Sequence, residues 1–125
     1  MKKEITFKIG IKKIKDLAFS VDESIDPEKE IGLKMKHSLQ FNKADSTIEF
    51  ILEISFLKKS ADKIFMSSRT GNIFSIPDLD KFESEDTAET YNIPDAMLAT
   101  IVSLSFTHSR ALIARNAEGT KFSDI

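Results

Sequence analysis

The stretch TGNIFSIPDL, residues 70–79, carries an apolar run directly into a proline. Its marked positions are Gly71, Ile73, Phe74, Ile76 and Pro77. Proline lacks a backbone N–H and so ends regular strand pairing, while glycine inside a strand is typical of a bulge or a close approach of two chains. We therefore expect residues 63–76 to form the last strand of a small sheet, whose apolar face another element must cover.

Three earlier segments alternate apolar and polar residues with the two-residue period of a strand that has one buried face. The predicted strands cover residues 4–22, 30–42 and 47–58. Lys13 and Lys15 interrupt the first of them, which predicts a bulge between residues 12 and 16. The third is apolar on both faces, as is typical of a central strand. Because short turns separate neighbouring strands, we expect an antiparallel meander.

The period changes after these strands, where the chain reads PDAMLATIVSLSFTHSRALIAR without glycine or internal proline. One stripe at helical spacing contains Met97, Ile101, Leu104, His108 and Ala111. This pattern predicts a helix over residues 94–116, joined to the last strand by an acidic crossover over residues 77–92. The predicted fold class is α+β: a four-stranded antiparallel meander sheet followed by one long covering helix, in a single domain of residues 1–125.

Composition excludes several classes of partner. The 125 residues carry a formal net charge of -2, so the chain as a whole does not attract phosphate backbones, and nucleic acid is not an expected partner. The N-terminus lacks the apolar region of a signal peptide, and we expect that no window approaches the length and hydropathy of a membrane span. Cysteine is absent, which removes disulfides and thiolate metal ligands. We expect a cytoplasmic protein without membrane insertion.

Catalytic patterns are not found. The two histidines, His37 and His108, have no acidic or nucleophilic neighbour at a recognised spacing, and we expect structural roles for both, with a pH-sensitive contact at a subunit interface as the alternative. Phosphate-binding, zincin and nucleophile-elbow motifs are missing. Two acidic clusters lack the spacing of a calcium loop and are predicted to be solvated, or to recognise a basic partner. We expect no enzyme, no cofactor and no metal site.

The apolar content is higher than one helix on one sheet face requires. The chain contains ten phenylalanines, and apolar residues lie on both faces of the later strands. A second copy of the protein would cover this surface, since most oligomers are built from self-complementary patches. A groove for apolar peptide segments would use it as well. The two interpretations are compatible.

The sequence resembles the SecB family of export chaperones in three places. The first strand, TFKIGIKKIKDLAFS, matches the family at Phe7, Ile9, Ile14, Lys15, Asp16, Leu17 and Phe19. The fourth strand ends with the family's Gly-x-Ile-Phe-Ser-Ile pattern, here residues 71–76. The predicted helix is similar to the family's long helix, which starts at a proline and ends near an arginine, here Arg110.

The resemblance implies an ATP-independent holdase that binds unfolded or nascent polypeptides in protein export, assembled as a homotetramer, a dimer of dimers. The substrate-contact candidates that follow from it are apolar positions close to the crossover: Phe65, Ile73, Phe74, Ile76, Leu79 and Phe82. For each of them, a place in the core or in a subunit interface is the alternative role.

Some family features are missing. Family members contact the translocase motor SecA through acidic positions on the outer sheet face; Asp16 matches one, but Ser20 and Ser67 stand where glutamate is common. The chain ends at Ile125 without the family's second helix and acidic tail, so SecA is a weakly supported partner. Three alternatives stay open: a dedicated chaperone of a toxin-antitoxin module, a module that only builds its own oligomer, and a small-ligand binder gated by His108.

Overall fold

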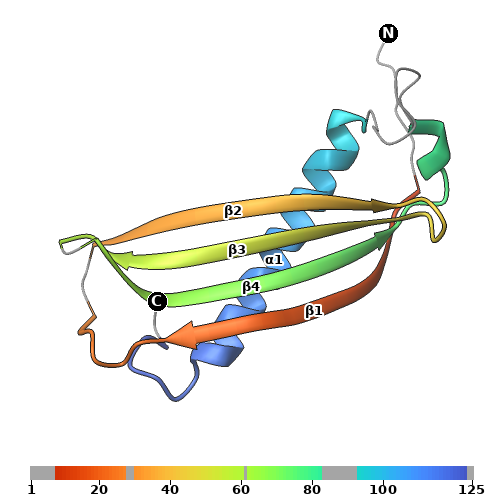
Figure 1. The fold of residues 1–125 in the computed structure, drawn as a ribbon. Coiled ribbons are helices and arrows are strands. Elements are labelled where there is room, and N and C mark those ends of the chain that lie inside the picture. The colour runs from red at the N-terminus through yellow and green to blue at the C-terminus, as the bar shows by residue number, and fades with distance from the viewer. Residues whose placement is uncertain (1–7, 28–29, 61, 83–92, 124–125) are drawn as a thin grey trace, which may run out of the picture.

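The computed structural model describes residues 8–27, 30–60, 62–82 and 93–123, which form one sheet with a long helix across one face (Figure 1). The elements are β1 (Gly10–Val21), β2 (Ile31–Asn42), β3 (Thr47–Lys58), β4 (Lys63–Ser75), the 3-10 helix η1 (Leu79–Phe82) and α1 (Asp95–Ala117). The predicted α+β class, with four antiparallel strands and a covering helix, is confirmed. Residues 4–7 of the first predicted strand and 83–92 of the predicted crossover lie outside the described residues.

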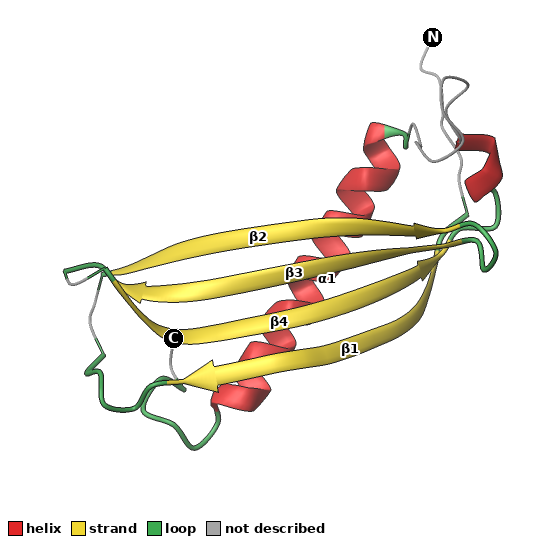
Figure 2. Cartoon of the chain, in the orientation of Figure 1, coloured by secondary structure: helices red, strands yellow, loops and turns green. Residues whose placement is uncertain are grey.

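The strand order is β1-β4-β3-β2 (Figure 2). Strands β2, β3 and β4 form the predicted meander, but β1 pairs with β4 and not with β2, so the expectation of a four-stranded meander was wrong for β1. The short turns of residues 43–46 and 59–62 force their strands to be neighbours. The longer connection of residues 22–30 instead links the two edges of the sheet, which gives a Greek-key order.

Strand β1 contains two bulges against β4, one between Ile11 and Lys13 and one between Asp16 and Ala18. The first confirms the bulge that the lysine interruption predicted. Each extra residue shifts the alternation of all the side chains that follow it. As a result, Ile14 pairs with Asn72 of β4, on the face that α1 covers. The preceding Lys12 and Lys13 share the opposite face, which we call the open face.

The hydrophobic core lies between α1 and the two central strands. Its strand residues are Ile48, Phe50, Leu52, Ile54, Phe65, Met66 and Phe74, and further members are Ile25, Ile76, Leu79, Met97, Ile101, Ile113, Ala117 and Phe122. Phe74 and Ile76 are fully buried, so the run before the proline supplies the centre of the core. Gly71 marks a close approach, since a Cβ there would lie 3.2 Å from Glu49 Oε2 and 3.3 Å from Leu17 Cδ1.

The face of α1 that packs on the sheet differs from the predicted stripe. Its buried residues recur every fourth position: Met97, Ile101, Ser105, Ser109, Ile113 and Ala117. Leu104 and His108 are only half-buried, and Ala111 is exposed. The prediction followed apolar character, whereas the helix turns its two serines toward β4 because small side chains allow a close approach there.

Buried polar side chains meet at the middle of this contact, and we call them the polar seam: Ser68, Thr70, Asn72, Ser105 and Ser109. The hydroxyls of Thr70 and Ser109 are hydrogen-bonded at 2.5 Å, and His108 Nδ1 lies 2.6 Å from Asn72 Oδ1. Ser68 Oγ, Asn72 Nδ2 and Ser105 Oγ have no hydrogen-bond partner among the described residues. Because an unpaired buried polar group costs about 1–3 kcal/mol, the seam weakens the middle of the helix–sheet contact.

Helix α1 is also long and apolar enough to cross a membrane, by length and composition, with a mean hydropathy of 1.3 over its most apolar window. The expectation that no window approaches a membrane span was therefore wrong. In this structure 28% of that window is buried, on the side that faces the sheet. The exposed side of α1 is mixed: Val102 is 41% accessible, while Ser103, Thr107 and Arg110 are exposed polar residues.

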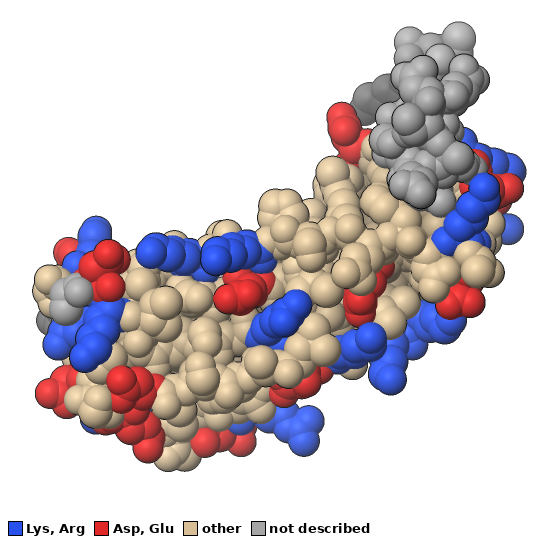
Figure 3. Space-filling view, viewed as in Figure 1, with Lys and Arg blue, Asp and Glu red and all other residues tan. Residues whose placement is uncertain are grey.

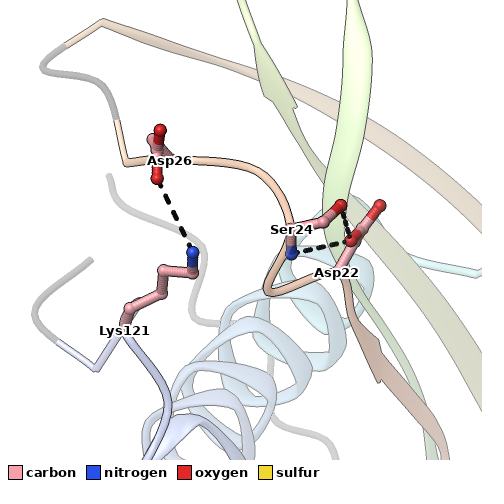
Figure 4. A network of polar contacts seen from close by, with 4 residues as sticks. All are labelled: Asp22, Ser24, Asp26 and Lys121. Carbon is pink, nitrogen blue, oxygen red and sulfur yellow. Dashed lines mark hydrogen bonds and ion pairs between the residues drawn. The ribbon is translucent and has the colours of Figure 1, made fainter.

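Polar contacts tie the connection after β1 to the turn after α1 (Figure 4). The backbone N–H of Ser24 donates to Asp22 Oδ1 at 3.0 Å, and the Ser24 hydroxyl contacts the same oxygen at 2.5 Å. Lys121 Nζ lies 3.7 Å from Asp26 Oδ1. In the core cluster below, the Phe122 ring stacks on Phe65 with 4.6 Å between ring centroids. These contacts close the end of the sheet where β1 stops.

We expect opposite effects from two serine substitutions in the polar seam. Ser105→Ala removes a buried hydroxyl without a partner and should raise the free energy of unfolding by about 1 kcal/mol, whereas Ser109→Ala removes the partner of Thr70 and should lower it by about 1 kcal/mol. Denaturant unfolding measures both. The intrinsic helix preference changes equally in the two variants, so equal shifts in stability would contradict this description of the seam.

A second prediction concerns acid. The hydroxyl of Ser24 and then its backbone N–H stabilise the ionised carboxylate and lower the pKa of Asp22 from its ordinary value of 3.8, with smaller help from Lys63 and Lys121. Because the folded-state pKa is the lower one, the resulting stability is present above pH 3.8 and disappears as the pH falls through the folded-state value.

The unfolding free energies of the wild type and Asp22→Asn should therefore converge as the pH falls from about 5 to about 2. Urea unfolding at a series of pH values measures the difference between the two proteins. A difference that stays constant across this range would show that the hydrogen bonds from Ser24 do not depend on the charge of Asp22.

Candidate functional site

Helix α1 crosses the sheet diagonally and packs on β1, β3 and β4 (Figure 1). Strand β2 is an edge strand on which the helix packs less closely than on β1, β3 and β4, so the residues that it turns toward the α1 side are incompletely covered. Leu33 and Met35 of this row are 51% and 53% exposed. Leu39 and Phe41, further along the strand, are half-buried. The excess apolar surface expected from the composition lies partly here.

A groove of about 540 Å³ separates the C-terminal half of α1 from β2 and β3, and we call it the α1 groove. Its lining residues are Leu33, Ile54 and Phe56 from the sheet and Phe106, Thr107, Arg110, Ala111, Ile113 and Ala114 from the helix. The small side chains of Ala111 and Ala114 leave the space, and the alternation of β2 directs Leu33 toward it. A site of this composition binds apolar groups by burial.

Arg110 is the only charged residue among the described residues that line the groove. It is exposed, and no ion pair connects it to another described residue. The groove thus combines an apolar floor with one free cation at its edge, which is unsuited to acid–base or nucleophilic chemistry. Nor do any three His, Cys, Asp or Glu residues of the described part of the chain lie close enough together to hold a metal ion.

None of the predicted substrate-contact residues lines the α1 groove, and most of them are buried. Phe65, Phe74, Ile76 and Leu79 are 3% exposed or less and belong to the core. Their burial fits the alternative role, a place in the core, because β4 is a central strand covered by α1; their contact with a substrate stays a prediction. Ile73 is half-buried on the open face and Phe82 is half-buried in η1; neither lines the α1 groove, and their contact with a substrate stays a prediction.

Asp16, the predicted partner contact, was expected on the outer sheet face. Its carboxylate instead accepts a hydrogen bond of 2.8 Å from Asn116 Nδ2 of α1. The bulge after Ile11 is the reason, because it moves the following alternate residues to the side of the helix. On the open face the hydroxyls of Ser20 and Ser67 are hydrogen-bonded to each other at 2.7 Å.

The two histidines both contact other side chains of the fold. The His37 ring stacks on Phe50 with 5.6 Å between centroids, and His108 bonds Asn72 in the seam. Sequence reasoning missed the groove residues, above all Leu33 and Phe106. The alternation of β2 does indicate that Leu33 lies on its apolar face. The expected four-stranded meander, however, would have made β2 a central strand, so an exposed apolar edge was not predicted there.

A four-stranded antiparallel sheet of this order with one long helix on a single face is a SecB-like α+β fold. The fold is similar to that of the Mycobacterium tuberculosis SecB-like chaperone Rv1957, solved in complex with a ChAD peptide from the HigA1 antitoxin Rv1956. The alignment covers 87% of this chain and 75% of that chain, with a TM-score of 0.56 and 11% sequence identity. At this identity the similarity establishes the fold alone. No family model matches the sequence, and no curated protein matches it significantly.

Proposed function

We propose that this protein is a chaperone that binds apolar segments of non-native polypeptides in the α1 groove without ATP. The main support for this proposal is the groove, which leaves apolar residues of β2 and α1 exposed to water at a cost in free energy unless another chain covers them. The SecB-like fold supports it, as does the peptide bound by the structurally similar chaperone. No bond is made or broken; the client is kept from aggregating while its apolar side chains are buried.

The size of the groove indicates weak binding at each site. Burying one Leu or Phe side chain contributes about 1.5–3 kcal/mol, and association costs about 4–15 kcal/mol in lost rigid-body freedom. A groove of about 540 Å³ holds only a few side chains, so one copy should release its client rapidly. Several grooves on one particle would hold a long client through a high effective concentration.

We therefore include a homo-oligomer, a dimer of dimers, in the proposed function. We propose that the copies meet on the exposed side of α1 around Val102, which is the large hydrophobic residue that the described helix leaves 41% exposed. We place the assembly in the cytoplasm, where nascent chains emerge, and propose no membrane insertion. Handover to a SecA-type motor is left out, because Asp16 is bonded to Asn116 and the open face carries the Ser20–Ser67 pair.

A second candidate function is that of a dedicated chaperone in a toxin-antitoxin module. The antitoxin peptide bound by the M. tuberculosis protein favours it. Such a protein would bind one partner segment strongly and protect unrelated clients poorly. The general holdase would instead delay aggregation of several unrelated proteins to a similar degree.

Substituting a residue that lines the α1 groove should weaken client binding without unfolding the protein. Leu33→Asp adds a charge to the groove floor and should weaken suppression of aggregation of an unrelated unfolding protein by about tenfold, the loss expected for one buried leucine. Ile64→Asp is the matched control, because Ile64 is 49% exposed, also lies in a strand and does not line the groove. If both variants lose activity equally, or neither does, the α1 groove is not the binding site.

The assembly is tested separately by light scattering. Val102→Glu should lower the mass of the particle to that of a smaller assembly or a monomer, because it adds a charge to the side of α1 on which the copies are proposed to meet. Ile64→Glu, of similar exposure but outside this helix surface, should leave the mass unchanged. A wild-type protein that is already monomeric would contradict the proposed oligomer while leaving the groove proposal in place.

A further inference from the structure

The open face of the sheet, opposite α1, carries an excess of positive charge. Figure 3 views this side and shows Lys and Arg side chains along both margins, with acidic residues between them. From the strand pairing, the charged strand residues of this face are Lys12, Lys13, Lys15, Lys34, Lys36 and Arg69, against Glu49 and Glu53. The net charge of the whole chain is -2, so the charge of this face is opposite in sign to that of the chain.

One end of this face is hollowed. A depression of about 580 Å³, which we call the lysine hollow, lies where β1 begins and β2 ends. Lys12, Lys13 and Lys15 form one wall, while Gln40, Thr47 and Ile73 are among the residues on the other sides. The first bulge of β1 builds the wall, because its extra residue puts Lys12 and Lys13 on the same face of the strand.

The lysines of the wall are not equivalent. Lys15 Nζ lies 3.1 Å from Glu49 Oε2, and the absence of a side chain at Gly71 leaves room for this pair. Lys12 and Lys13 form no ion pair with any described residue. The hollow therefore presents Lys12 and Lys13 next to one internally neutralised pair, with Lys43 and Asp45 also in its lining and the exposed amide of Gln40 as a hydrogen-bonding group. Thr47 lines the hollow as well but is only 6% exposed.

We propose that the lysine hollow is a docking surface for an acidic, extended segment of a partner polypeptide, separate from the α1 groove. Lys12 and Lys13 meet the partner's carboxylates, and the exposed amide of Gln40 bonds its backbone. A nucleic acid fits less well, because Asp45, which lines the hollow beside the neutralised Lys15–Glu49 pair, repels closely spaced phosphates, whereas a peptide N–H group can donate to it. The proposal does not depend on the client-binding role of the groove.

Edge strands often carry lysines that discourage pairing with other sheets, which is the competing explanation for this charge. Strand β2 supplies the control, because Lys34 and Lys36 lie on the same face and on the other edge but do not line the hollow. A role in edge protection applies equally to both pairs of lysines. A docking role applies only to Lys12 and Lys13.

Fluorescence anisotropy with a labelled peptide of alternating glutamate and glycine tests the proposal, with the matching glutamine peptide as its neutral control. The wild type should prefer the glutamate peptide, and the preference should fall as salt is raised. Lys12→Gln with Lys13→Gln should weaken binding by about five- to tenfold, the effect of two exposed charge contacts. Lys34→Gln with Lys36→Gln should change it by less than about twofold, and both double variants should keep wild-type suppression of aggregation.

A charge-reversal variant distinguishes loss of the lysine contacts from loss of the folded structure. Lys12→Glu with Lys13→Glu should gain binding to a peptide of alternating lysine and glycine, a gain that loss of structure does not produce. The proposal is overturned if both lysine pairs matter equally, if the glutamine peptide binds as well, or if single-stranded oligothymidylate displaces the glutamate peptide more effectively than unlabelled peptide does. It is also overturned if removing Lys12 and Lys13 changes only the mass of the assembly, since the hollow would then receive a second copy.

Discussion

One helix is too narrow to cover a sheet of four strands, and the arrangement of this protein depends on that mismatch. A helix with its side chains is about 10–12 Å wide, while four strands at about 4.8 Å spacing extend further than that. Because α1 crosses diagonally over β1, β4 and β3, the uncovered apolar row falls on β2. The α1 groove is the space left along this boundary, between the side of the helix and an edge strand that still has an apolar face.

The contact between helix and sheet is apolar at its two ends and polar in its middle. Met97 and Ile101 at one end and Ile113 at the other are buried in the core, while Ser105 and Ser109 meet Thr70 between them. Small side chains bring the helix close to β4, but three unpaired polar atoms reduce what the contact contributes to stability. The hydrogen bonds in the middle therefore set the position of the helix on the sheet, while the apolar contacts at its two ends contribute most of the stability.

The two faces of the sheet are separated chemically by the bulges of β1. Ile14 is returned to the helix side, while Lys12 and Lys13 are kept together on the open face. The α1 side thus gathers apolar surface that suits burial of a client, and the open face gathers free charge that suits polar recognition. Under the function proposed above, an apolar segment is held on one side of the sheet while a charged partner docks on the other.

The sequence by itself determined the elements, because alternation with a period of two and a helical run of apolar residues depend only on neighbours along the chain. Phe74 and Ile76 were correctly placed at the end of a strand that a helix covers, and the lysine interruption correctly indicated a bulge. Only the tertiary structure decided which strand pairs with β1, since alternation looks the same whichever strand is the partner. Leu33 therefore became a groove residue, Phe74 a core residue and Asp16 a partner of Asn116 through contacts between residues far apart in the chain, which no local pattern encodes.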